Sequence, residues 1–295
     1  MTKSGQVERS FKDNSHPLFS LLKLRDVNAG GAQVRACLPY QESFTDGADK
    51  GLAKGWSVIT LDTLLGMAVY GRLQETRPIA TIDLAVDYLE PAGKGADLIC
   101  EANCHDIKDN IAFVSGCISD ARDGYQITKV AAKFIIKNPL RPQGERGSSQ
   151  YIPQPWELPQ AELCPGFEKL KSNVPFARWL NPERYTFNGN AVFALEFNDS
   201  HIGDPYARTV HGGILTSLME TAAVGTLAIN KNAKELADPL SLKVQFMRPT
   251  GARDTYASAS IIRDGKNIII VDAHAWQESP DKPSARATFL FKASN

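Results

Sequence analysis

The feature that most constrains this chain is an internal repeat with an offset of 158 residues. The residues that recur at this offset are Asp62-Thr63 with Glu220-Thr221, Pro91-Ala92-Gly93 with Pro249-Thr250-Gly251, Gly55 with Gly213, Leu84 with Leu242, Val86 with Val244, and Tyr88 with Phe246. Single matches of this kind arise by chance, but one constant offset across a helix, a strand and a turn indicates a duplication. The sequence therefore predicts two similar halves.

Both halves have the same predicted order of elements, namely a strand, a long helix and a run of further strands. Alternation predicts the first strand at 32–39 in the first half and at 190–197 in the second. Apolar periodicity predicts the long helix at 55–71 in the first half and at 212–229 in the second. The later strands are predicted at 79–89, 97–105, 111–119 and 126–136, and again at 241–247, 255–262, 268–276 and 285–292. An antiparallel sheet that wraps around one helix buries that helix on most sides. We expect an α+β fold.

The middle of the chain lacks any hydrophobic period. Six prolines lie between residues 138 and 165, with Gly147-Ser148-Ser149 among them, and such a composition is typical of an extended linker. The predicted organisation is an N-terminal domain at 1–138, a linker at 139–165 and a C-terminal domain at 166–295. Short helices are predicted at 16–22 and 167–180.

The second long helix carries two unusual features. His211, Gly212 and Gly213 stand at its start, where glycines expose backbone amides at the positive end of the helix dipole. Glu220 then lies in an apolar stretch, where a carboxylate is costly without a partner or a function. Glu220 is seven residues from Gly213, about 10 Å along the axis at roughly 1.5 Å per residue, so one carbonyl group cannot contact both.

A site built from residues of both halves would bring an acid and a glycine amide within reach of one carbonyl group. If the two long helices pack antiparallel, the acid of each half faces the glycine amides of the other. His211-Gly212-Gly213 would then face Asp62, and Glu220 would face Lys54-Gly55. The first half has Ala53 and Lys54 where the second has His211 and Gly212. The second half therefore has the better amide cradle, meaning the backbone N–H groups exposed at the start of its long helix. Lys54 could instead neutralise Glu220 and make that side structural.

Composition excludes several classes of function. The chain has 33 basic and 33 acidic side chains and zero formal net charge, which argues against nucleic acid or an anionic membrane as a partner. No secretory signal is visible, and we expect no apolar run that approaches the length of a membrane span. Five cysteines, an odd number, fit a reducing compartment, so we expect a cytoplasmic protein. Cys100 and Cys104 on one strand would lie about 13 Å apart, too far for a shared zinc, and no metal is expected.

The segment Val-His-Gly-Gly-Ile-Leu, with an acid nine residues after the histidine and Leu242 to Pro249 downstream, resembles the hot-dog acyl-CoA thioesterases, especially the phenylacetyl-CoA thioesterase-like branch. The resemblance is clear over 180–295 and fainter over 30–137. It implies two tandem hot-dog domains packed as an intramolecular pseudo-dimer, acyl-CoA as substrate, no cofactor, and possible further homo-oligomerisation. It also implies that an amide of Gly212 or Gly213 polarises the thioester carbonyl and that Asp62 and Glu220 are the acids of the two sites.

Several roles remain open from the sequence. His211 is assigned to capping and shaping the turn rather than to proton transfer. The basic residues near the strand ends of the second half could bind the phosphates of coenzyme A, or could be solvated surface charges: Arg248, Arg253, Arg263 and Lys266. Alternative functions are a hot-dog enoyl-CoA hydratase, suggested by Asn198-Asp199-Ser200-His201 with Asp204-Pro205, and a non-catalytic acyl-CoA-binding protein.

Overall fold

The computed structural model describes residues 17–46, 51–73, 77–138, 174–187, 189–204, 208–231 and 238–293. The first half contains α2 (Pro17–Leu22), β1 (Arg25–Gly30), β2 (Gln33–Leu38), the 3-10 helix η1 (Glu42–Phe44), α3 (Lys54–Leu73), β3 (Ile79–Tyr88), β4 (Leu98–Lys108), β5 (Ile111–Asp120) and β6 (Gln126–Ile136). The predicted linker at 139–165 lies outside the described residues, so its boundaries stay a prediction.

The second half repeats this order. It contains α5 (Pro175–Leu180), β7 (Glu183–Phe187), β8 (Asn190–Leu195), η3 (Asp199–His201), β9 (Ile202–Asp204), β10 (Thr209–Val210), α6 (Gly212–Lys231), β11 (Pro239–Phe246), β12 (Thr255–Asp264), β13 (Ile268–Trp276) and β14 (Ala285–Lys292). The long helices α3 and α6 have 20 residues each, and their first residues, Lys54 and Gly212, stand at the repeat offset. The duplication predicted from single residues therefore extends to whole elements.

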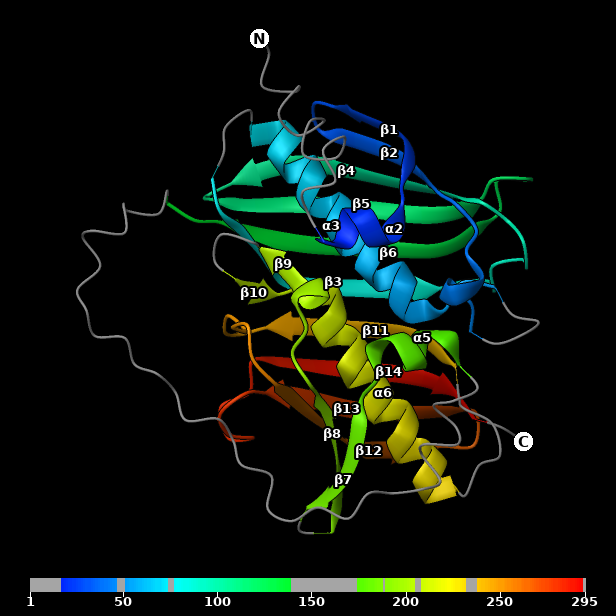
Figure 1. The fold of residues 1–295 in the computed structure, drawn as a ribbon, viewed down its shortest axis with the longest axis vertical. Coiled ribbons are helices and arrows are strands. Elements are labelled where there is room, and N and C mark those ends of the chain that lie inside the picture. The colour runs from blue at the N-terminus through cyan, green and yellow to red at the C-terminus, as the bar shows by residue number, and fades with distance from the viewer. Residues whose placement is uncertain are drawn as a thin grey trace.

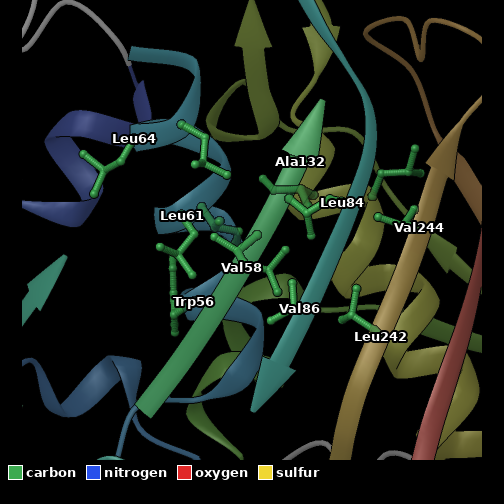
Figure 2. Packing of buried hydrophobic residues seen from close by; sticks show 14 of the residues in the cluster. Trp56, Val58, Leu61, Leu64, Leu84, Val86, Ala132, Leu242 and Val244 are labelled. Atoms are coloured by element: carbon green, nitrogen blue, oxygen red, sulfur yellow. The ribbon is translucent and has the colours of Figure 1, made fainter. Parts of the chain in front are cut away.

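Twelve strands form one continuous antiparallel sheet. Its order is β1-β2-β4-β5-β6-β3-β11-β14-β13-β12-β8-β7, so the first half supplies one side and the second half the other. The halves meet where β3 pairs with β11, with Leu84 opposite Val244 and Val86 opposite Leu242. Figure 2 shows these four apolar side chains at the join. Ala85 pairs with Lys243, its own counterpart in the repeat, so a pseudo-twofold axis passes through this pair.

The long helices α3 and α6 lie side by side on one face of the sheet and run in opposite directions (Figure 1). Both are apolar around most of their circumference because the sheet covers one side and the partner helix another. Leu61, Leu64 and Leu65 of α3 are fully buried, and each such side chain contributes about 1.5–3 kcal/mol of burial free energy. The tight α3–α6 contact brings residues of the two halves together.

The short helices cross between the halves. Helix α2 of the first half contacts η3 and β9 of the second half, and α5 of the second half contacts η1 of the first. Phe176 and Trp179 of α5 pack on Trp56, which begins the buried face of α3. Each half therefore packs a short helix against elements of the other half.

Four strands were not predicted from the sequence. Both β1 and β7 are edge strands, and β1 carries mostly exposed polar residues without an apolar alternation. The β9–β10 hairpin has only three and two residues in its strands, too short to show a period. Of the predicted helix at 167–180, the structure describes only α5, since 167–173 lie outside the described residues. Pairing with a neighbour, rather than local pattern, makes these segments strands.

Helix α6 also corrects the expectation that no apolar run approaches a membrane span. Among the described residues it is long and apolar enough to cross a membrane, with a mean hydropathy of 1.4. Within the fold, 78% of that apolar window is buried against the sheet and α3, as in the core helix of a soluble protein.

Candidate active site

The carboxylate of Asp62 lies at the contact between the two long helices. Asp62 is on α3 and only 5% of its surface is exposed. Its Oδ1 accepts a hydrogen bond from Thr81 Oγ1 at 2.9 Å, and its Oδ2 accepts one from the backbone amide of Gly213 at 3.1 Å. Two donors, one from each half, therefore hold this buried acid in a fixed orientation.

His211 precedes α6 and shares that amide. Its Nδ1 accepts from Gly213 N at 3.0 Å, so the ring proton belongs on Nε2. Nε2 lies 3.2 Å from Thr63 Oγ1 and 3.6 Å from Asp62 Oδ2. Because Thr63 already donates its hydroxyl proton to the Ile59 carbonyl at 2.7 Å, its oxygen accepts from Nε2. His211 thus makes the capping contact that was expected of it, and its N–H also faces the acid.

The β9–β10 hairpin sets the position of His211. The His211 amide donates to the His201 carbonyl at 2.8 Å. Gly203 packs directly against His211, since a Cβ on Gly203 would stand 2.7 Å from His211 Cα. The His201 side chain is itself buried, which lowers its pKa to about 4, and its Nδ1 accepts from the Asn198 amide at 3.2 Å. His201 is therefore a neutral residue that caps η3.

Gly212 differs from Gly213 in its hydrogen bonding. The Gly212 amide donates to no group among the described residues, whereas the Gly213 amide is shared by Asp62 and His211. A Cβ on Gly212 would stand 2.9 Å from Asp62 Oδ2 and 3.1 Å from Cζ of Phe246. Only glycine leaves this position open, and its N–H at the positive end of α6 remains available to an oxygen acceptor.

The mirror acid, Glu220, has a different environment. The residue is partly exposed, but its Oε2 is sealed from solvent and has no hydrogen-bond partner among the described residues. Burial raises the pKa of Glu220 to about 8; Asp46 and Asp238 add to this shift and Lys54 opposes it. At neutral pH Glu220 is therefore mostly protonated.

Of the residues around Asp62, Gly213 keeps a counterpart in Gly55, but three others do not. At the repeat offset Ala53 replaces His211, Lys54 replaces Gly212 and Pro239 replaces Thr81. The Lys54 ammonium lies 3.4 Å from Asp238 Oδ1 and 5.3 Å from the centre of the Tyr88 ring, so Asp238, not Glu220, is its ion-pair partner.

The amide cradle on this side is also covered. A Cβ on Gly55 would stand 2.1 Å from Cζ of Phe176, so the ring of Phe176 lies against the start of α3. The corresponding face of Gly213 meets the backbone of Ile59 and the ring of His211 instead. The pseudo-symmetry of the fold therefore does not extend to the two cradles.

The basic residues predicted to bind phosphate do not form one cluster. Arg248 and Arg253 lie in the β11–β12 connection, which is joined to the start of α6 because the Val210 amide donates to the Thr250 carbonyl. Arg263 and Lys266 flank Asp264, which forms an ion pair with Lys231 at the far end of α6. A 20-residue helix is about 30 Å long, so Arg263 and Lys266 lie at the opposite end of α6 from the Asp62 centre, and their part in phosphate binding stays a prediction.

Near the start of α6, Arg248 and Arg253 differ in their charged partners. Arg253 pairs with Glu278 at 2.9 Å. Arg248 is exposed and donates to the Pro283 carbonyl at 2.6 Å, and among the described residues it has no carboxylate partner. Among the described residues, Arg248 is therefore a cation at this end of α6 that has no carboxylate partner and is exposed to solvent.

Sequence reasoning did not single out Thr81, noted Thr63 only as a repeat match, and noted Phe246 only as a repeat match and within the segment from Leu242 to Pro249. Thr81 carries no local signal, since its relation to Asp62 comes from the packing of β3 beside α3. The repeat itself held a clue, because the counterpart of Thr81 is a proline that cannot donate a hydrogen bond.

Two family models match the chain, one in each half. The description "Thioesterase superfamily" matches residues 52–126, and "Acyl-CoA thioesterase N-terminal domain" matches residues 203–292. Together they cover more than half of the 295 residues and include both long helices. The chain belongs to the thioesterase superfamily, as a tandem hot-dog protein. A search of curated proteins gave no match.

Solved structures show the same fold over almost the whole chain. A putative thioesterase from Novosphingobium aromaticivorans has a TM-score of 0.64 at 11% identity and covers 92% of this chain and 98% of its own. A hot-dog protein of unknown function from Alicyclobacillus acidocaldarius has a TM-score of 0.61 at 14% identity, with 91% and 96% covered. An acyl-ACP thioesterase from Bacteroides thetaiotaomicron has 0.55 at 13% identity, with 88% and 98% covered. These likenesses establish the tandem hot-dog fold.

Proposed function

We propose that this thioesterase hydrolyses acyl-CoA to a free acid and coenzyme A at one composite centre, made by Asp62 and the start of α6. The observation that carries the proposal is the position of the Asp62 carboxylate beside Gly212 and Gly213, with the Gly212 amide unoccupied. An acid and a free helix-end amide are the two groups that thioester hydrolysis needs.

The chemistry follows from these groups. The thioester carbonyl oxygen accepts a hydrogen bond from the Gly212 amide, which stabilises the oxyanion; one such donor is worth about 3–4 kcal/mol of barrier. Asp62 takes a proton from a water molecule as that water attacks the carbonyl carbon. The tetrahedral intermediate then breaks its carbon–sulfur bond, and the leaving thiolate takes up the proton. Thr81 and Gly213 keep the carboxylate oriented through both steps.

The mirror centre is assigned no part in the hydrolysis. Glu220 carries its proton at neutral pH and so cannot act as a base there. Phe176 covers the amides at Gly55. One catalytic centre per chain is the consequence.

Coenzyme A is favoured as the carrier of the acyl group because Arg248, at the same end of α6, has no carboxylate partner in the part of the chain that the structure describes. An acyl carrier protein is the alternative carrier, since the fold includes an acyl-ACP thioesterase. The hydratase alternative has less support, because His201 is engaged in capping η3 and Asp199 pairs with Arg208 at 2.9 Å. Free thiols at Cys37, Cys100, Cys104 and Cys117 support a reducing compartment such as the cytoplasm.

The test is thiol release from a panel of acyl-CoAs and acyl carrier proteins of varied acyl length and aromatic content. We expect release from acyl-CoA by the wild type, a loss of that release in Asp62→Asn, and its retention in Glu220→Gln. Undiminished turnover in Asp62→Asn, or hydrolysis of acyl carrier proteins alone, would overturn the proposal. Tight binding of acyl-CoA without turnover would favour the binding-protein alternative.

A further inference from the structure

The Nε2–H group of His211 faces two oxygen acceptors. Nε2 lies 3.2 Å from Thr63 Oγ1 and 3.6 Å from Asp62 Oδ2. The first distance is that of a hydrogen bond, and the second is too long for one. The proton on Nε2 is therefore donated to Thr63, although an ionised carboxylate is the stronger acceptor of the two.

The backbone of α3 holds Thr63 as an acceptor. The Thr63 hydroxyl donates its proton to the Ile59 carbonyl, one turn earlier in the helix, at 2.7 Å. The hydroxyl oxygen then has only lone pairs to offer to His211. The same bond selects one of the two side-chain rotamers that threonine adopts in a helix, so the acceptor is fixed in position.

The direction of this N–H group matters for Asp62. A carboxylate offers about four lone-pair positions, and the Thr81 hydroxyl and the Gly213 amide use one on each oxygen of Asp62. A third donor would take one of the positions left for the attacking water of the proposed hydrolysis. A hydrogen bond to the ionised form also makes a carboxylate a weaker base. The N–H of His211 is near enough to become that third donor if Thr63 does not accept it.

We propose that Thr63 is a positioning residue, which holds the N–H of His211 away from Asp62 and so keeps the carboxylate available as the base. This inference rests on the proposed function and adds a residue to that same centre. Thr63 acts through His211, and its contribution is to the orientation of a donor.

The repeat supplies a matched control in Thr221, the counterpart of Thr63. The Thr221 hydroxyl also donates to the carbonyl one turn earlier, that of Ser217, at 2.9 Å. The counterpart of His211 is Ala53, so no imidazole reaches Thr221 from the corresponding position. The two threonines thus share the bond to the helix backbone and differ in the histidine.

The kinetic experiment measures thiol release from the acyl-CoA that the wild type hydrolyses fastest. Thr63→Val keeps the shape of threonine but has no acceptor, so the N–H of His211 turns to Asp62. We expect kcat to fall about tenfold, the order of one hydrogen bond to a charged group, with little change in KM. Thr63→Ser should restore kcat, and Thr221→Val should keep the wild-type value. The thermal unfolding midpoint checks that each variant is folded.

The second measurement is a ¹H–¹⁵N spectrum of the imidazole of His211 without substrate, assigned by comparison with His211→Asn. We expect a protonated Nε2 and an unprotonated Nδ1 in the wild type. In Thr63→Val the Nε2 proton should move to lower field, because a hydrogen bond to a carboxylate is shorter and stronger. Thr63→Ser and Thr221→Val should give the wild-type signal.

The two measurements separate this inference from the proposed function. An unprotonated Nε2 in the wild type, an unchanged Nε2 proton in Thr63→Val, or an unchanged kcat in that variant overturns the role of Thr63 and leaves the thioesterase function standing. An equal loss of kcat in Thr221→Val also overturns it, since the effect would then come from the helix. If the wild type hydrolyses no acyl-CoA, the proposed function falls and the catalytic role of Thr63 falls with it, while the spectrum still decides where His211 directs its proton.

Discussion

Asp62 Oδ2 and the backbone amide of Gly213 are 3.1 Å apart, although 151 residues separate them along the chain. The contact joins the middle of α3 to the start of α6, and it is possible because the two helices pack in opposite directions. Neither half alone contains both groups. The centre therefore depends on the assembly of the two halves, with the acid from one and the amides from the other.

Asp62→Asn is expected to lower kcat for acyl-CoA hydrolysis by a factor of about 10²–10⁴, the usual contribution of a general base. The amide side chain retains one oxygen to accept from the Gly213 amide, and its NH2 group can donate to the Thr81 hydroxyl oxygen, but it cannot take up a proton at neutral pH. Steady-state thiol release measures the effect, with the thermal unfolding midpoint as the check on folding. Glu220→Gln is the matched control, and an equal loss in both variants would contradict a single centre.

Substitution of the two adjacent glycines should separate catalysis from stability. In Gly212→Ala the new Cβ meets the Asp62 and Phe246 side chains, so we expect kcat to fall by about a hundredfold through a disturbed oxyanion donor. In Gly213→Ala the Cβ would stand 2.7 Å from Ile59 Cα, and because backbone cannot give way easily the unfolding free energy should fall by about 1–3 kcal/mol. Urea unfolding and kinetics on both variants test this; a larger stability loss in Gly212→Ala would reverse the assignment.

Glu220→Gln should stabilise the protein at alkaline pH. The pKa of Glu220 is raised from 4.5 to about 8, so between those pH values the folded chain holds a proton that the unfolded chain has released. The contribution of Glu220 to stability therefore falls as the pH rises from about 4.5 to about 8. Glutamine cannot ionise, so the variant should match the wild type near pH 4 and exceed it by on the order of 1–3 kcal/mol at pH 9.

Urea unfolding at pH 4 and pH 9 measures this difference. Glu90→Gln, at an exposed position outside both centres, is the control and should show no such change with pH. A constant difference between Glu220→Gln and the wild type at the two pH values would show that folding does not shift the pKa of Glu220.

Thr81→Val should weaken the orientation of Asp62 without removing it. Valine has the shape of threonine but no donor for Asp62 Oδ1, which the Thr81 hydroxyl reaches at 2.9 Å. We expect kcat to fall about tenfold, in line with the 1.5–3 kcal/mol value of a hydrogen bond to a charged group, while KM changes little. Thr81→Ser keeps the hydroxyl and should keep most of the activity; a Ser variant as slow as the Val variant would point to packing instead.

The amino-acid sequence predicts the duplication, the two buried helices and most strands, because these follow from a constant offset and from apolar periodicity. It also placed Asp62, Gly212 and Gly213 in one centre, since the spacing within one helix separates Glu220 from the glycines. It did not reveal β1, β7 or the β9–β10 hairpin, whose few residues become strands only through pairing partners.

The packing of the two halves shows which of the two acids is surrounded by hydrogen-bonding groups. Thr81, His211 and Gly213 converge on Asp62 from separate elements, while Phe176 of α5 crosses from the other half to cover Gly55. Contacts of this kind depend on the crossing of elements far apart in the chain. A repeat offset can say that Glu220 corresponds to Asp62. The raised pKa of Glu220, however, comes from its burial, and the hydrogen-bond donors of Asp62 come from other elements, and only the packed structure defines both.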